Sequence, residues 1–169
     1  IQTNIQSRSI KNSLDTFISL IEKRGLEKQS IKGSLHFDPL MDCLKKGALN
    51  NDLWENFRLI QEKIIDLKAF KSINIQGVEY HNAGASISQE LAFTLAQLSE
   101  YFTNAPYLEP NKIQISLGVS TNYFFEIAKF RAIRILWTQI LNAFKKNFTL
   151  YLIGFVVVRA YDSNHAIPR

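Results

Sequence analysis

Apolar residues recur along the chain with two different spacings. From Ser9 onward they return every three to four residues as far as Ile21, and Gly25 follows, so the pattern predicts an amphipathic helix that ends at that glycine. The short run Ile31–Phe37 carries β-branched or aromatic residues at its ends, which is typical of a strand. The pattern therefore changes from helix to strand within the first forty positions or so.

The same alternation continues as far as Val158. Helix starts are marked by Asp38-Pro39, by a capping box of Ser86 and Gln89, and by Thr121 or Asn122 as a cap. The predicted helices cover residues 9–25, 38–46, 52–69, 86–102 and 122–144, with loops at 77–85 and 104–111. The predicted strands begin near Ile31, Ser72, Lys112 and Phe148, and the last is the continuous apolar run Phe148–Val158.

The strand starts lie about 40 residues apart, and helix separates each pair, which gives a βαβα succession. Helical crossovers of this kind produce parallel sheets, so the fold class is α/β, either an open doubly wound sheet or part of a (β/α) barrel. A closed eight-stranded barrel takes about 250 residues. With about four parallel strands, the barrel alternative predicts a partial TIM-type barrel.

The composition is that of one globular domain of 169 residues, with 46% apolar and 21% charged side chains. The longest apolar run, Leu150–Val158, has about half the length of a membrane-spanning helix, so we expect no membrane segment. Charges and amides interrupt the apolar positions of residues 1–24, so we expect no signal peptide. Cys43 is the lone cysteine, which excludes an intrachain disulfide and predicts a reducing, cytoplasmic location.

The charge of +5 does not indicate a nucleic-acid partner. The basic doublets, Lys45-Lys46 and Lys145-Lys146, are short, and most other cations have an acidic neighbour in the sequence. Nucleic-acid binders usually show a basic stripe with interleaved aromatic residues. We therefore interpret the excess charge as a solubilising surface.

Motifs for metal and nucleotide chemistry are missing from the sequence. His36, His81 and His165 have no metal-ligand spacing among themselves or with Cys43, and neither a Walker loop nor a Gly-x-Gly-x-x-Gly run occurs. Cys43 lies inside a predicted helix and is expected to be a small core residue and not a nucleophile. Chemistry must therefore come from other polar positions.

Polar side chains follow the predicted strands, where α/β folds bind their ligands. The candidates are His36, Asp38, Glu79, Tyr80, His81, Asn82, Ser120, Thr121 and Asn122. For Asp38, Asn82 and Asn122 the competing interpretation is that they cap helices or hold turns.

Three segments carry long motifs. Residues 33–39 read GSLHFDP, residues 77–92 read GVEYHNAGASISQELA, and residues 122–132 read NYFFEIAKFRA. In this order they resemble signatures of the methylmalonyl-CoA mutase family, over roughly residues 31–142. The resemblance implies a coenzyme-A-binding TIM barrel in an isomerase that interconverts succinyl-CoA and methylmalonyl-CoA through a radical generated by adenosylcobalamin.

The resemblance also implies an organisation. Residues 1–147 are similar to the N-terminal part of the acyl-CoA-binding barrel domain, and residues 148–169 are the final strand-like run and an irregular tail. The cobalamin motif of the family, Asp-x-His-x-x-Gly, is absent, so we expect this fragment itself to bind no cofactor. Many bacterial members pair a catalytic large chain with a related small chain whose site is degenerate.

Three positions distinguish the two kinds of chain. The resemblance aligns Glu79 with the catalytic histidine, His36 with a substrate-contacting glutamine and Lys46 with the arginine that holds the substrate carboxylate. Lysine lacks the two-pronged donor geometry of arginine, and a carboxylate at position 79 repels an anionic substrate. The resemblance therefore implies a small, non-catalytic subunit that is inactive alone, forms a heterodimer with the catalytic large subunit and has open strand edges that would permit self-association.

Two other functions stay open. A self-contained α/β domain could bind or convert a small molecule with His36, Glu79 and His81, because a carboxylate and a histidine together suit acid–base work. Alternatively, the chain could bind coenzyme A without chemistry, with Lys45 and Lys46 near a phosphate.

Overall fold

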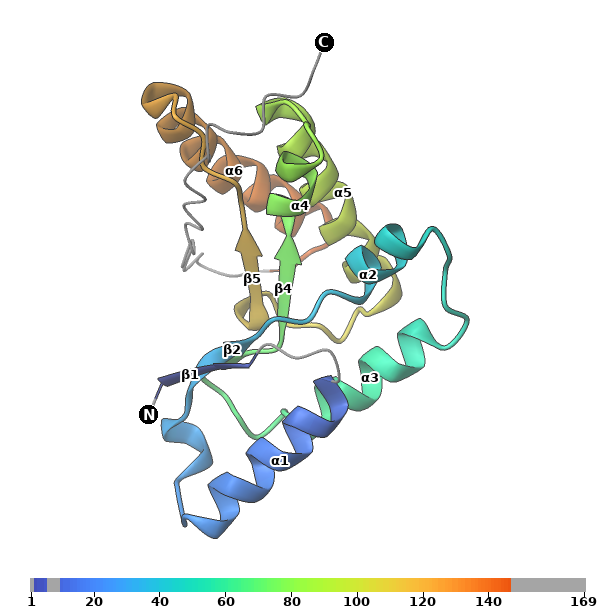
Figure 1. Ribbon diagram of the computed structural model, residues 1–169, viewed down its shortest axis with the longest axis vertical. Coiled ribbons are helices and arrows are strands. Elements are labelled where there is room, and N and C mark those ends of the chain that lie inside the picture. Colours follow the sequence, from blue (N-terminus) through green and yellow to red (C-terminus); the bar gives the residue numbers. More distant parts are fainter. Residues whose placement is uncertain (1, 6–9, 147–169) are drawn as a thin grey trace, which may run out of the picture.

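The computed structural model describes residues 2–5 and 10–146, which form an α/β fold of short parallel strands and helices (Figure 1). The strands are β1 (Gln2–Ile5), β2 (Lys32–Leu35), β3 (Phe70–Lys71), β4 (Ile73–Gln76) and β5 (Ile113–Ser116). The helices are α1 (Ile10–Lys23), α2 (Pro39–Lys46), α3 (Leu53–Lys63), α4 (Gly77–Asn82), α5 (Ile87–Asn104) and α6 (Tyr123–Ala143), with 3-10 turns at Lys28–Ser30 and Pro110–Lys112. The predicted α/β class is confirmed.

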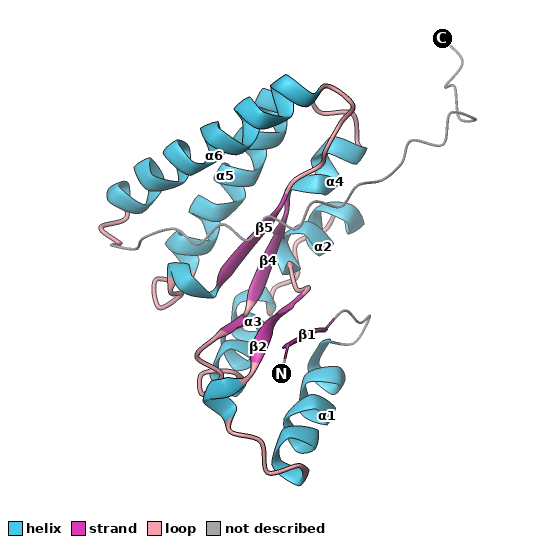
Figure 2. Ribbon diagram, turned by 90° about the vertical axis from the view of Figure 1, so that its left-hand side faces the viewer, coloured by secondary structure: helices cyan, strands magenta, loops and turns pink. Residues whose placement is uncertain are grey.

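All of these strand pairs are parallel. β2 lies between β1 and β3, and β4 pairs with β5. The two sheets are continuous in space, because only Ser72 separates β3 from β4 and the Asn74 N–H donates to the carbonyl of Phe37 just after β2 (3.1 Å). The strands therefore lie side by side in the order β1, β2, the consecutive strands β3 and β4, and finally β5 (Figure 2). Helices connect these parallel neighbours, as the forty-residue period predicts.

Around β4 and β5 the sheet has one apolar and one polar face. The isoleucines of both strands are buried in the core: Ile73, Ile75, Ile113 and Ile115. Leu98 of α5 and Ile133 and Trp137 of α6 belong to the same core. Successive side chains of a strand alternate between faces, so the polar residues between the isoleucines project to the other side. These are Asn74, Gln76, Gln114 and Ser116.

The predicted end signals of α2 and α5 form as expected. Asp38 caps α2 by accepting a backbone N–H, Pro39 occupies the first turn, and Gly47 ends the helix in the left-handed conformation (φ 66°). Ser86 and Gln89 form the reciprocal capping box of α5. These local signals position both helices that begin near the C-terminal ends of β2 and β4.

Two predicted boundaries are wrong. Residues 77–85 were expected to be a loop, but they contain α4, which is stabilised by packing: a Cβ on Gly77 would overlap the Thr94 hydroxyl of α5. The helix predicted over residues 52–69 ends at Lys63, and the apolar residues that follow reach the core from a turn. Tertiary contacts decide both cases, because periodicity alone cannot distinguish a buried turn from a helix.

β1 was not predicted, because its sequence Gln-Thr-Asn-Ile holds one apolar residue and shows no alternation. The predicted strand Phe148–Val158 and the tail up to Arg169 lie outside the described residues. Within residues 2–5 and 10–146, no helix combines the length and the apolar character needed to cross a membrane.

Gly33 allows β1 and β2 to lie close together, which gives a first prediction. Its φ is +155°, and a Cβ there would overlap the carbonyl oxygen of Thr3 and lie 2.9 Å from the Phe70 ring. We expect Gly33→Ala to lower the free energy of unfolding in urea by about 3 kcal/mol, through strain and displacement of β1. The control is Gly84→Ala, where φ is also positive but the space is open, with a cost of about 1 kcal/mol. Equal losses for the two variants would show that β1 does not pack against Gly33.

Candidate functional site

Three polar side chains form a hydrogen-bonded row across neighbouring strands. The Ser116 hydroxyl donates to Asn74 Oδ1 (2.7 Å), and the Asn74 amide nitrogen donates to Nδ1 of His36 (3.3 Å). Nδ1 accepts only in the neutral imidazole, and burial lowers the pKa of His36, which favours that form. The row brings the predicted residue His36 together with two side chains that were not predicted.

Gln114 extends this row on β5. It is the strand partner of Asn74 and is only 5% exposed. Its Nε2 donor has no hydrogen-bond partner in the described part of the chain. A buried, unpaired donor costs about 1–3 kcal/mol, so this position favours an acceptor atom from outside. We call His36, Asn74, Gln114 and Ser116 the polar sheet face.

Asp38 lies beneath the end of β2 and is 1% exposed. Its Oδ2 accepts the N–H of Gln76 (2.8 Å), and its Oδ1 accepts from the Tyr101 hydroxyl (2.8 Å), the Gln97 amide (2.6 Å) and the N–H of Met41 (3.2 Å). Burial raises the pKa of Asp38, and the four hydrogen bonds oppose that rise by favouring the carboxylate. The capping role expected for Asp38 is confirmed. All four donors to its carboxylate are groups of α2, β4 and α5, so these hydrogen bonds hold the packed elements together.

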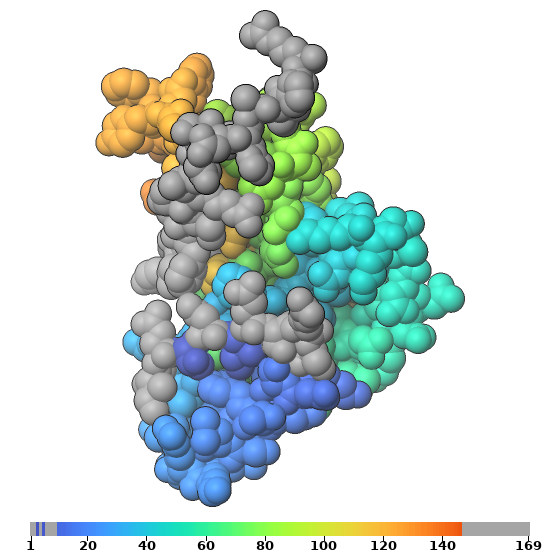
Figure 3. Space-filling view, viewed as in Figure 1, coloured from blue at the N-terminus to red at the C-terminus, as the bar shows by residue number. Residues whose placement is uncertain are grey.

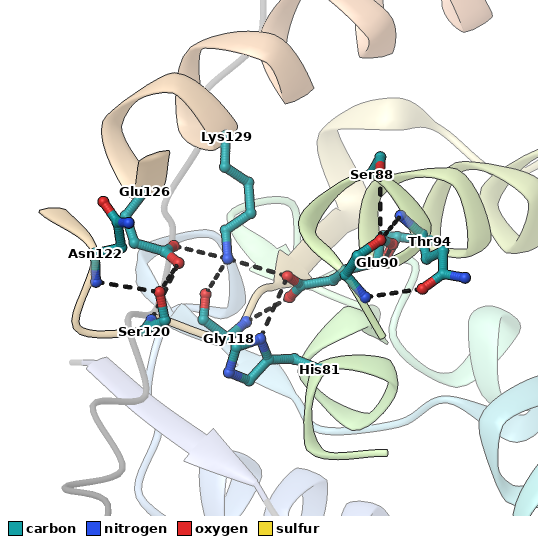
Figure 4. Close-up of polar contacts among 11 residues, drawn as sticks. His81, Ser88, Glu90, Thr94, Gly118, Ser120, Asn122, Glu126 and Lys129 are labelled. Carbon is teal, nitrogen blue, oxygen red and sulfur yellow. Dashed lines mark hydrogen bonds and ion pairs between the residues drawn. The ribbon is translucent and has the colours of Figure 1, made fainter. Parts of the chain in front are cut away.

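A buried cluster of charged side chains lies between α5 and α6 (Figure 4). Lys129 Nζ is 3.0 Å from Glu90 Oε2 and 2.7 Å from Glu126 Oε2, and it donates to the carbonyl oxygen of Gly118 (2.6 Å). Glu90 Oε1 accepts the N–H of the same glycine (2.6 Å). Glu90 and Lys129 therefore hold the backbone just after β5 by both polar groups of Gly118, and Glu126 pairs with the same ammonium.

Ser120 connects this cluster to the loop before α6. Its N–H and hydroxyl both donate to Glu126 Oε1, at 3.1 and 2.7 Å. Burial raises the pKa of Glu126, but hydrogen bonds from Lys129 and Ser120 outweigh it and hold this pKa below its usual value. Asn122 stands at the predicted N-cap position of α6, although its side chain makes no capping hydrogen bond.

His81 connects the cluster to the surface. Its Nδ1 lies 3.8 Å from Glu90 Oε2, and 23% of its side chain is exposed. A Cβ on Gly118 would overlap the His81 ring, so glycine is needed for the imidazole to lie against this backbone. His81 therefore belongs to the charged cluster and not to the polar sheet face.

The three positions predicted to form a degenerate substrate site are not joined. His36 bonds to Asn74, whereas Glu79 forms an ion pair with Lys45 at 3.2 Å. Lys46 is exposed at the end of α2 and makes no ion pair with another described residue. Among the described residues, no hydrogen bond or ion pair connects His36, Lys46 and Glu79 with one another.

The other candidates have structural surroundings. The Tyr80 hydroxyl donates to the Gln97 amide oxygen (3.2 Å), and Asn82 is the last residue of α4. Cys43 is half-buried beside an apolar groove, so its expected place in the core is wrong. In residues 2–5 and 10–146, no three His, Cys, Asp or Glu side chains are arranged to hold a metal ion.

The sequence contains a signal of the charged cluster, although the spacing of apolar residues alone does not reveal it. Glu126 and Lys129 share the buried side of α6 with Ile133 and Trp137, at spacings of three and four residues. A carboxylate and an amine on the apolar side of a helix rarely stay there unpaired. Charged residues on that side therefore indicate a buried ion pair. They do not identify Glu90, the further partner of Lys129 on another helix.

Comparison with known proteins places these residues in context. The family model described as methylmalonyl-CoA mutase matches residues 2–150. The methylmalonyl-CoA mutase small subunit of Porphyromonas gingivalis is 36% identical over 138 residues, covering 78% of this chain and 22% of the relative. Methylmalonyl-CoA mutase of Rhizobium meliloti is 31% identical over 142 residues (78% and 20%), and the large subunit of Propionibacterium freudenreichii subsp. shermanii is 25% identical over 142 residues (78% and 19%). The chain thus spans about a fifth of the length of these curated relatives.

Replacing Lys129 tests the charged cluster. Lys129→Met leaves two carboxylates, Glu90 and Glu126, buried without their cation, so we expect the free energy of unfolding in urea to fall by about 3–5 kcal/mol. Arg134→Met, on the exposed side of the same helix, serves as the control and should change stability by less than about 0.5 kcal/mol. Similar stabilities for the two variants would contradict the cluster.

Glu126→Gln gives a pH-dependent prediction. Because the pKa of Glu126 is lowered in the folded protein, its carboxylate adds stability above its ordinary value of 4.5, and this contribution is lost as the pH falls through the folded-state pKa. We expect the variant to be about 1–3 kcal/mol less stable at pH 7. The deficit should shrink steadily in urea titrations at acidic pH. A deficit independent of pH would mean that the charge of Glu126 contributes nothing.

Proposed function

Because the chain belongs to the methylmalonyl-CoA mutase family, we propose that it is part of a small, non-catalytic subunit that supports a catalytic large subunit. In this proposal the heterodimer interconverts succinyl-CoA and methylmalonyl-CoA with adenosylcobalamin. The present chain contributes part of the small subunit's barrel domain.

The relatives support the choice of subunit. Identity to a protein named as a small subunit is 36%, whereas identity to one named as a large subunit is 25% over a similar length. The names of these relatives, small and large subunit, also describe an enzyme of two kinds of chain. A chain of the small kind therefore has a natural partner of the large kind.

The ion pair between Glu79 and Lys45 carries the non-catalytic part of the proposal. Glu79 stands where the resemblance places a catalytic histidine, and its carboxylate faces the Lys45 ammonium at 3.2 Å. A carboxylate held by a lysine neither donates a hydrogen bond nor attracts an anionic acyl group. Among the described residues, His36 and Lys46, the other replaced positions, form no hydrogen bond or ion pair with it.

The strand order supports a partial barrel. Parallel neighbours β1, β2, β3 with β4, and β5 alternate with helices, as in half of an eight-stranded (β/α) barrel. Among the described residues, β1 and β5 each have one edge with no strand partner. Further strands must close such a sheet, so we propose that the rest of a small subunit provides them.

The described residues do not fit adenosylcobalamin. Nδ1 of His36 is occupied by the Asn74 amide, and His81 lies against Glu90 with its ring on Gly118. Neither histidine stands in the Asp-x-His-x-x-Gly pattern of the family. We therefore assign the cofactor to the large subunit and derive no step through it on this chain.

Coenzyme A binding without chemistry is the second candidate function. It is favoured by the buried Nε2 donor of Gln114 on the polar sheet face, which has no partner among the described residues and suits an amide or hydroxyl oxygen of a ligand. A self-contained catalytic domain has less support, because His36, Glu79 and His81 lie in three separate sets of contacts.

An activity assay tests the proposed function. We expect this chain, supplied with adenosylcobalamin and succinyl-CoA, to form no methylmalonyl-CoA above the blank, and to elute together with the large subunit of the same organism in size-exclusion chromatography. The large subunit assayed alone is the control for activity. Turnover by the isolated chain would overturn the non-catalytic assignment.

A further inference from the structure

The beginning of α6 exposes an unusual group of aromatic side chains. Tyr123, Phe124 and Phe125 are 69%, 81% and 61% exposed, and Ile135 further along is 64% exposed. Figure 3 shows this part of the helix, in orange, standing out from the rest of the molecule. Contiguous exposed apolar groups of this size mark interaction surfaces in soluble proteins.

The exposed residues continue as a regular stripe along α6. Phe124, Ala128, Arg131, Ile135 and Thr138 are all exposed and follow one another at spacings of four, three, four and three residues. This spacing places them on one side of the helix, away from its core-facing side. It is also the spacing of the seam between two packed helices. We call these five residues the α6 stripe.

The charges on α6 indicate which kind of partner suits its exposed side. Its single acidic residue, Glu126, is buried in the charged cluster, whereas Arg131 and Arg134 are exposed. Two copies of α6 packed together through this stripe would bring two Arg131 side chains, each with Arg134 beside it, close to one another without a carboxylate from either helix. A helix whose apolar side is flanked by Asp or Glu would instead pair with both arginines. Two cations on an otherwise apolar surface are too few for a nucleic-acid site.

We propose that the α6 stripe binds an amphipathic helix of the catalytic large subunit, one whose aliphatic side is flanked by acidic residues. The inference rests on the proposed function, which supplies this partner. Phe124 and Ile135 enter the apolar side of the partner helix, and Arg131 and Arg134 bind its carboxylates. The aromatic residues and arginines provide the main affinity, as is common at interface centres.

Binding to the large subunit of the same organism tests the proposal by titration calorimetry. We expect Phe124→Ser with Ile135→Ser to weaken binding at least about tenfold, and Arg131→Glu with Arg134→Glu to do the same, with the second loss greatest at low salt. The controls are Ile65→Ser, an isoleucine of another segment that is 70% exposed, and Lys11→Glu on α1. Both should bind within about twofold of the unchanged chain. Thermal unfolding of each variant checks that the fold is intact.

The outcomes separate the inference from the proposed function. If the unchanged chain binds and the stripe variants bind equally well, the α6 stripe is not the interface, while the proposed function stands. If the unchanged chain does not bind the large subunit, the proposed function fails and the inference fails with it. Light scattering of the chain alone and sedimentation with phosphatidylserine vesicles complete the test. A self-association or a vesicle affinity that the stripe variants abolish, without an effect on the large subunit, would also overturn the inference.

Discussion

One buried carboxylate, that of Asp38, fixes how β2 and α2 pack against β4 and α5. Asp38 follows β2, caps α2 and accepts hydrogen bonds from Gln76 at the end of β4 and from Gln97 and Tyr101 of α5. Burying a charge is costly unless donors surround it, and here four donors reach a side chain that is 1% exposed. Few arrangements of β2, β4 and α5 satisfy all four donors at once. Tyr101 also packs against Phe57 of α3 (5.4 Å between ring centroids), so the same contact positions the next helix.

A second set of buried charges, Glu90, Glu126 and Lys129, holds the backbone just after β5, as Asp38 holds the elements that follow β2. Glu90 and Lys129 hold both backbone polar groups of Gly118, and Glu126 holds Ser120. Buried carboxylates and their hydrogen-bond donors therefore hold the backbone at the C-terminal ends of β2 and β5. These contacts leave the polar sheet face as the part able to contact a ligand, because the Nε2 donor of Gln114 there has no partner among the described residues.

The elements predicted from the sequence are those whose causes are local. The Asp38-Pro39 cap, the Ser86 capping box and the alternation of β5 all have short-range signals, and the structure contains each of them. β1 and α4 could not be predicted in this way, because strand pairing at Gly33 and packing against α5 stabilise them. The site follows the same rule. His36, Glu79 and His81 were singled out individually, but their separate partners, on β4, α2 and α5, depend on the tertiary fold.

Whether this chain handles the reacting group is decided most directly by an experimental structure of its complex with the large subunit, prepared with succinyl-CoA and adenosylcobalamin. In that structure we predict that the corrin and the succinyl group lie on the large subunit, that Glu79 of this chain remains paired with Lys45, and that no succinyl group lies beside it. A succinyl group or a corrin bound beside Glu79 and His36 of this chain would contradict the non-catalytic role.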